Sequence, residues 1–217
     1  MQRSGVTRVQ LLAVASSVAF LVLAVIASAG QVDALDQDLR QVFRPDDVWG
    51  PWQLVFGNVV DGAAPRVSLA VLAVSGALAA VLRTSWRPLV YVAALALTGA
   101  LVTQIAKALI GRADPHGDVG TLSGSFPSGH MVILLVCLGG VLLVWRQHPP
   151  VWAWALVALA GLTMGFSLLL LSMHWFTDVA GGALLAVPLL VVAASPRFVG
   201  PVHRTGRTTP ASVGSPT

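Results

Sequence analysis

The chain has 217 residues, of which 56% are hydrophobic and only 10% are charged. About a quarter of the residues in soluble domains are charged, so this composition, with a mean hydropathy of +0.80, argues against a soluble globular protein. The thirteen basic residues are spread over loops and tails instead of forming one stripe. We therefore expect no nucleic-acid partner, although the sequence pI is about 10.6.

Six apolar segments approach or reach the length of about 20 residues that a helix needs to cross a bilayer. In chain order they cover residues 11–30, 67–82, 89–110, 129–145, 151–173 and 176–194. We predict an all-α fold, a polytopic membrane bundle of six transmembrane helices in one domain, residues 1–194. The remainder, residues 195–217, is predicted to be a disordered cytoplasmic tail.

The beginning of the chain also resembles a secretion signal, because Arg3 and Arg8 precede the first apolar segment. That segment is long for a signal peptide, so we favour an uncleaved first helix. A polar stretch, residues 31–66, follows it. Within this stretch, residues 49–60 contain two Trp and one Phe, and we predict that they lie along the membrane interface, where Trp rings prefer to sit.

Six spans would divide the loops and termini between two sides of the membrane, and the charges on these two sides differ sharply. One side holds both termini and the 83–88 and 146–150 links, and it has no acidic residue. Its basic residues are Arg3, Arg8, Arg83, Arg87, Arg146, Arg197, Arg204 and Arg207. The other side carries all nine Asp and five basic residues. The positive-inside rule then places both termini in the cytoplasm and the loops with His130 and His174 outside the cell membrane.

The single cysteine, Cys137, lies within an apolar segment. One cysteine excludes both a disulfide within the chain and a cysteine-based metal site. We interpret it as a small packing residue.

Two basic residues stand close to the end of the third apolar segment. Lys107 and Arg112 precede a loop rich in Gly, Asp and Ser that leads to His130. Either residue alone is compatible with snorkelling, in which a long side chain reaches the lipid headgroups. Their position before His130 favours an anion-binding site.

The fourth apolar segment begins with Ser128, Gly129 and His130, after Pro127. The first turn of a helix has unpaired amide groups and the positive end of the helix dipole, which together attract phosphate. Ser128 is also explained as a helix cap without any further role. The imidazole of His130 has no such explanation, because a membrane helix does not need one to begin.

His174 and Asp178 stand four residues apart between the fifth and sixth segments. This spacing puts both on one face of a helix. A carboxylate on one ring nitrogen fixes the tautomer of a histidine and leaves the other nitrogen free to attack. A structural pair, an N-cap role for Asp178, and a zinc site with two His and one Asp are alternatives. The nearby cations favour an anion over a metal.

These residues form three motifs that resemble those of the type 2 phosphatidic acid phosphatase superfamily, which also includes the vanadium haloperoxidases. The family patterns are K-x6-R-P, P-S-G-H and S-R-x5-H-x3-D. The chain has K-x6-D-P from Lys107 to Pro115, P-S-G-H from Pro127 to His130, and S-L-x5-H-x3-D from Ser167 to Asp178. The chain thus resembles the integral membrane branch of the family, with Asp114 and Leu168 in place of two motif arginines.

The resemblance implies a role for each matching residue. His174 is the nucleophile that forms a phosphohistidine, Asp178 orients it, and His130 protonates the leaving group. The residues that hold the phosphoryl oxygens are Lys107, Ser128 and the amide of Gly129. Members of the family need no metal, so we expect no cofactor.

Both family arginines would bind phosphate, so their replacement removes two positive charges from the phosphate site. Arg112 is our candidate for replacing them, as a substrate-binding residue, and His116 is a weaker one. Asp114 is an alternative partner for Arg112 that would withdraw it from the substrate.

We therefore expect a membrane phosphatase that hydrolyses a lipid phosphate or polyprenyl diphosphate at the outer leaflet. A lipid phosphotransferase on the same scaffold is a second hypothesis. A catalytically weak or inactive member that binds a lipid or a protein partner is a third. The sequence defines neither the lipid nor the oligomeric state.

Overall fold

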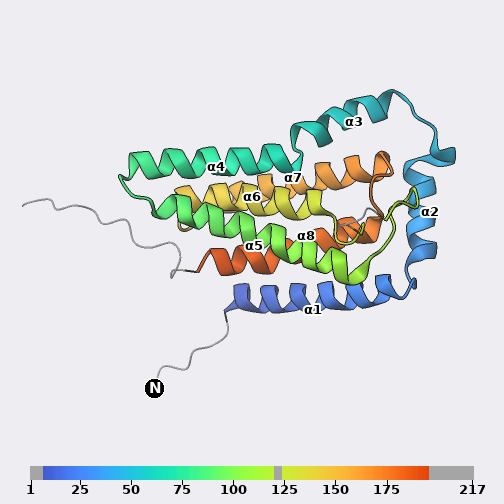
Figure 1. Cartoon of the computed structure of the whole chain (residues 1–217), viewed down its shortest axis with the longest axis horizontal. Helices are drawn as coiled ribbons and strands as arrows, with labels where there is room; N and C mark the ends of the chain where they lie inside the picture. Colours follow the sequence, from blue (N-terminus) through green and yellow to red (C-terminus); the bar gives the residue numbers. More distant parts are fainter. Residues whose placement is uncertain (1–6, 120–123, 196–217) are drawn as a thin grey trace, which may run out of the picture.

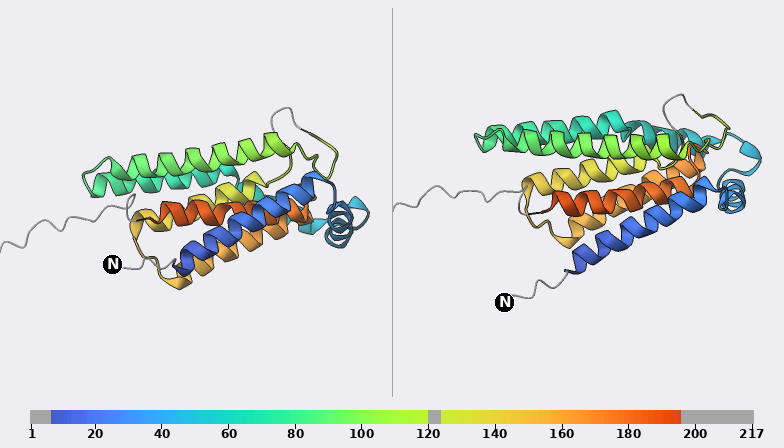
Figure 2. Two further views of the ribbon diagram at one scale, coloured as in Figure 1. Left: turned by 90° about the horizontal axis from the view of Figure 1, so that it is seen from below. Right: turned by 60° about the horizontal axis from the view of Figure 1, so that its bottom comes forward.

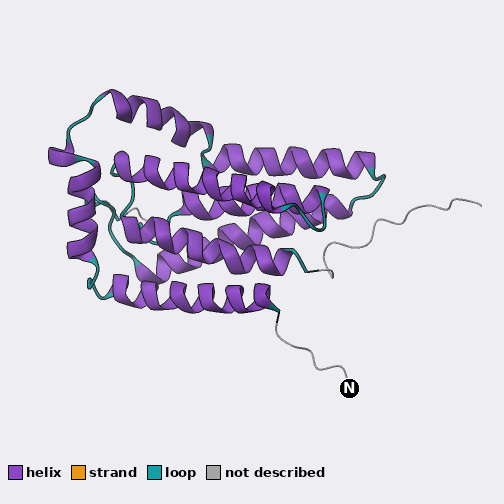
Figure 3. Ribbon diagram, turned by 180° about the vertical axis from the view of Figure 1, so that it is seen from behind, coloured by secondary structure: helices purple, strands orange, loops and turns teal. Residues whose placement is uncertain are grey.

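The computed structural model describes residues 7–119 and 124–195. In these ranges the chain consists of helices and loops without strands (Figures 1 and 3). The elements are α1 (Arg8–Ser28), α2 (Asp33–Phe43), the 3-10 turn η1 (Pro45–Asp47), α3 (Pro51–Gly62), α4 (Pro65–Leu82), α5 (Arg87–Ile110), α6 (Gly129–Trp145), α7 (Val151–Leu170) and α8 (Phe176–Ala193).

The six predicted apolar segments correspond to α1 and α4 to α8. By length and composition, five helical stretches of the described chain can span a membrane: α1, α3 with α4, α5, α7 and α8. Helix α6 is equally apolar but has only 17 residues. The protein is thus an all-helical membrane bundle, as predicted. Helix α2, inside the polar stretch, was not predicted.

The fifth segment ends earlier than predicted, at Leu170 instead of Met173. Ser172 adopts a left-handed backbone conformation, with φ of 52°, and the amide of Met173 donates to the carbonyl of Leu168 at 3.0 Å. This is the hydrogen-bond pattern with which helices commonly terminate. The early end leaves His174 in the connection between α7 and α8.

Helix α6 is the centre of the bundle and contacts α4, α5, α7 and α8. At 1.5 Å per residue it is roughly 25 Å long, shorter than the hydrocarbon core of about 30 Å. Most of its side chains are buried, so it needs no lipid-facing surface. It begins short of the neighbouring helix ends (Figure 1), and the buried residues 124–128 lead into it.

Helix α1 packs along α8 (Figure 2). The hydroxyl of Ser16 donates to the carbonyl of Leu184 at 2.9 Å, and the ring of Phe20 stacks on that of Phe126, with 5.8 Å between centroids. Helix α1 thus packs as a member of the bundle.

Helix α2 lies across one end of the bundle, which we call the site end (Figure 1). Eight of the nine Asp lie in α2, in the connections that gather here or in the first turn of α8, and Asp61 lies at the junction of α3 and α4, further along the bundle. Arg8, Arg83, Arg87 and Arg146 lie at the opposite end. The predicted separation of charge is therefore present in space. The position of each end, and of α3, relative to the membrane stays a prediction. The tail, apart from Ser195, lies outside the described residues.

Two glycines of α8 let the beginning of α6 approach closely. A Cβ on Gly182 would stand 2.8 Å from the carbonyl oxygen of Ser128, and one on Gly181 would stand 2.6 Å from the ring of Phe126. Both distances are shorter than a van der Waals contact. The absence of side chains here sets the distance between His130 on α6 and Asp178 on α8.

We predict that Gly182→Ala lowers stability by about 1–3 kcal/mol, the usual cost of overpacking, because the Ser128 backbone has to move. The apparent melting temperature of the detergent-purified protein measures this. Gly57→Ala on α3 is the matched control, since a Cβ there meets nothing within 4 Å. Equal melting temperatures for the two variants would contradict the close contact.

Candidate active site

The structure brings His130 and His174 together at the site end, with ring centroids 5.9 Å apart and planes at 69°. His130 lies in the first turn of α6, and His174 lies between α7 and α8. The fold therefore makes neighbours of the two histidines that the sequence analysis selected.

Asp178 is fully buried and supports His174. Its Oδ2 is 3.5 Å from the Nδ1 of His174, a long contact of the kind that often shortens when substrate binds. The same oxygen accepts the amide of Trp175 at 3.0 Å, in the manner of a capping box. Asp178 thus caps α8 and faces the ring of His174. Because Nδ1 lies toward the carboxylate, Nε2 is the ring nitrogen on the side away from Asp178.

Ser125 completes this arrangement, although the sequence analysis did not single it out. Its hydroxyl donates to Oδ2 of Asp178 and lies 3.4 Å from Nδ1 of His174. Its amide donates to the carbonyl of Arg112 at 2.6 Å. A serine in a loop rich in Gly and Ser gives no sequence signal for such a role.

Lys107 is turned into the protein and is only 8% exposed. Its Nζ donates to the carbonyl of Gly124 at 2.6 Å, and a Cβ on Gly129 would stand 3.7 Å from its Cε. The ammonium group therefore lies beside the beginning of α6, which excludes snorkelling. An ammonium has three N–H donors, so two remain for an anion.

Ser128 is the N-cap of α6, and its hydroxyl oxygen accepts the amide of Met131 at 3.5 Å. Its own amide donates to the carbonyl of Asp178 at 2.9 Å. The capping interpretation is therefore confirmed, while the hydroxyl proton stays available to a ligand. The first-turn amides of Gly129 and His130 have no acceptor within the helix, and Lys107 adds its charge beside them.

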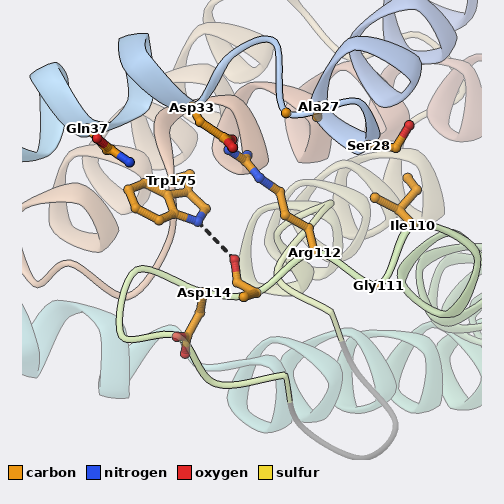
Figure 4. A pocket seen from close by; sticks show the side chains of 11 residues that line it. Ala27, Ser28, Asp33, Gln37, Ile110, Gly111, Arg112, Asp114 and Trp175 are labelled. Carbon is orange, nitrogen blue, oxygen red and sulfur yellow. Dashed lines mark hydrogen bonds and ion pairs between the residues drawn. The ribbon is translucent and has the colours of Figure 1, made fainter.

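Arg112 gives its donors to other protein side chains. Its Nη2 contacts Asp33 and Asp36, each at 2.8 Å. Its Nη1 contacts Thr177 Oγ1 at 2.7 Å and Asp178 Oδ1 at 3.2 Å. Figure 4 shows the side chain reaching toward Asp33, beside the ring of Trp175. The direct phosphate contact predicted for Arg112 would require one of these bonds to be exchanged.

The environment also strengthens the charge of Arg112. Burial by itself lowers the pKa of the guanidinium, but the hydrogen bond to Asp36 and the charge of Asp178 help to raise it overall. The group therefore stays cationic across all physiological pH values.

The two positions that lack the family arginine lie in different surroundings. The carboxylate of Asp114 accepts the amides of His116 and Asp118 within its own loop and points away from Arg112 (Figure 4). Other carboxylates hold Arg112 instead. Leu168 is 0% exposed and packs in an apolar cluster with Met164 and Leu171. An arginine there would bury a charge among apolar side chains, which is costly.

The zinc alternative finds no support in the geometry. Within residues 7–119 and 124–195, no three His, Cys, Asp or Glu side chains are grouped so that they would hold a metal ion.

The fold and the site define a helical membrane protein in which two histidines and a buried lysine lie together at the beginning of α6. The chain matches the PAP2 superfamily over residues 67–198, and it belongs to that superfamily. Its fold is similar to that of the transmembrane PAP2 type phosphatidylglycerolphosphate phosphatase from Bacillus subtilis, with a TM-score of 0.72 and 23% identity over 83% of this chain and 93% of that one. The comparison with curated proteins gives no significant match.

We predict that Lys107→Met weakens the binding of orthophosphate by about 10- to 100-fold, the range expected for loss of a charge-assisted hydrogen bond. Titration calorimetry of the detergent-purified protein measures the dissociation constant. Arg66→Met removes an exposed cation from the beginning of α4 and serves as the control. If both variants bind like the wild type, Lys107 is no anion ligand.

Proposed function

We propose that the protein is a membrane phosphatase that hydrolyses a lipid phosphate or diphosphate through a phosphohistidine. The main support is the meeting of His130 and His174 at 5.9 Å between ring centroids, with a buried cation, Lys107, beside the beginning of α6. Membership of the PAP2 superfamily and the membrane fold support the same class of reaction.

In the proposed first step, Nε2 of His174 attacks phosphorus and the bond from phosphorus to the leaving oxygen breaks. His130 donates a proton to that oxygen. In the second step, His130 takes a proton from water, whose oxygen attacks phosphorus. The bond from phosphorus to His174 breaks and phosphate leaves.

The phosphoryl oxygens need donors throughout this reaction, because negative charge concentrates on them in the transition state. In our proposal they contact the ammonium of Lys107, the hydroxyl of Ser128 and the amide of Gly129. Asp178 keeps the proton on Nδ1 of His174 and stabilises the ring when it becomes positive. None of these roles needs a metal.

Transfer of the phosphoryl group to an alcohol is compatible with the same intermediate, since an alcohol can replace water in the second step. An inactive, lipid-binding member is the remaining alternative, and the loss of both motif arginines is its best support. The placement of Asp178 and Ser125 around Nδ1 of His174 favours an active site over this alternative.

We predict that detergent-purified protein releases phosphate from phosphatidic acid, phosphatidylglycerophosphate or a polyprenyl diphosphate, and that vanadate inhibits the release. His174→Ala should lower the rate at least about 10³-fold, because it removes the nucleophile. His148→Ala at the opposite, Arg-rich end is the control. Failure to hydrolyse any of these lipids, or equal activity of His174→Ala, would contradict the proposal.

The charge separation leads us to propose that the site end faces the outside of the cell membrane and that the substrate lies in the outer leaflet. A membrane-impermeant maleimide added to intact cells should then label Asp118→Cys at the site end and leave Gln147→Cys unlabelled. The native Cys137 is 1% exposed and contributes little background. The reverse pattern would place the site in the cytoplasm.

A further inference from the structure

Asp36 on α2 is a buried carboxylate that belongs to none of the three motifs. It is 1% exposed, whereas its neighbours Asp33 and Asp38 are exposed. Its Oδ1 accepts the amide of Thr177 at 3.0 Å, and its Oδ2 accepts the hydroxyl of Thr177 at 2.5 Å. The same Oδ2 accepts Nη2 of Arg112 at 2.8 Å. Asp36 is therefore fixed by groups at the beginning of α8 and after the end of α5.

Arg112 connects Asp36 to the carboxylate behind the nucleophile. One terminal nitrogen contacts Asp36, and the other contacts Oδ1 of Asp178. The planar guanidinium can bind both because its donors have a fixed geometry. It also lies over the ring of Trp175, 5.5 Å from the centroid, and that indole donates to the carbonyl of Ala113 at 2.9 Å. The position of Arg112 is thus determined on several sides.

A buried carboxylate is tolerated only when charges and hydrogen bonds compensate it. Asp36 and Asp178 are both buried and share the positive charge of Arg112. The two oxygens of Asp178 have separate partners: Arg112 contacts Oδ1, while Ser125, the Trp175 amide and His174 face Oδ2. The contact to Oδ1 therefore fixes the rotation of the carboxylate that faces His174.

We propose that Asp36 is a positioning residue, which acts through Arg112 and Thr177 to hold Asp178 in the orientation that His174 needs. This inference rests on the proposed function, in which His174 is the nucleophile. Asp36 itself does not contact the substrate. Helix α2, although outside the motifs, is then a part of the catalytic assembly.

The test compares Asp36→Asn with Asp38→Asn, an exposed position on the same helix. In lipid phosphate hydrolysis, Asp36→Asn should lower kcat about 10- to 100-fold, the loss expected for a charge-assisted bond, with little change in KM. Asp38→Asn should leave both constants unchanged. In an Arg112→Gln background, Asp36→Asn should cause a smaller further loss of kcat, because only its contact with Thr177 remains. A purely structural role would lower the melting temperature and leave the kcat of the folded protein unchanged, which would overturn the proposal.

A second measurement does not depend on turnover. Vanadate binds a nucleophile in a five-coordinate geometry and so reports the position of His174, whereas orthophosphate reports the anion ligands. Asp36→Asn should weaken vanadate binding about 10- to 100-fold and orthophosphate binding less than about 3-fold. Asp36→Asn could weaken vanadate binding more than orthophosphate binding in a protein that hydrolyses no lipid. That result would refute the proposed function and keep the positioning role. Equal changes for both anions, or wild-type protein that binds neither, would overturn the positioning role.

Asp33→Asn provides a further variant if Asp36→Asn does not fold. Asp33 is 52% exposed and contacts the same nitrogen of Arg112 at 2.8 Å, so its replacement should preserve the fold. We expect a decrease of about 2- to 5-fold in vanadate affinity, smaller because solvent screens an exposed ion pair. If Asp36→Asn cannot be purified and Asp33→Asn binds vanadate as tightly as the wild type, this result contradicts the positioning of Asp178 by Arg112 that the proposal requires.

Discussion

The buried negative charge of Asp178 determines how the site end is organised. A carboxylate without solvent needs donors on both oxygens, and here they come from Arg112 after α5, Ser125 before α6 and the Trp175 amide at the beginning of α8. The structure cannot bury this charge unless the three connections converge. In the proposed reaction the same charge keeps His174 in the attacking tautomer, so the requirement for folding and the requirement for catalysis coincide.

The bundle makes this convergence possible by packing backbone against backbone. Gly181 and Gly182 let α8 approach the loop before α6, and Phe126 fills the space next to α1, where it stacks on Phe20. Helix α6 is the shortest of the apolar helices and is enclosed by its neighbours, so its first turn lies inside the bundle. His130, Ser128 and the amides of that turn are thus partly removed from water, where hydrogen bonds to a charged group are stronger.

Local patterns in the sequence were sufficient to predict the membrane helices and to select candidate site residues that the fold brings together. Apolar runs define α1 and α4 to α8, and the spacing of the motifs selected Lys107, His130, His174 and Asp178. The partners of Arg112 were not predictable, because Asp36 lies 76 positions away in a stretch with many acids. Helix α2 is short and polar, and Ser125 resembles other loop serines. Burial distinguishes Asp36 from Asp33 and Asp38, and contacts with Asp178 and His174 distinguish Ser125. Both are properties of the folded chain.

The family match does not include helix α2, which contributes two of the carboxylates around Arg112. The match begins at residue 67, after the segment that contributes Asp33 and Asp36. A shortened chain beginning there would retain every signature residue and yet lack two of the three carboxylates that Arg112 contacts. Its guanidinium would keep Asp178 and Thr177 as partners on Nη1, while Nη2 would be available to an incoming anion. A search for the three motifs would therefore find all of them in such a truncated protein. The charges around its Arg112 would nevertheless differ from those in the whole chain.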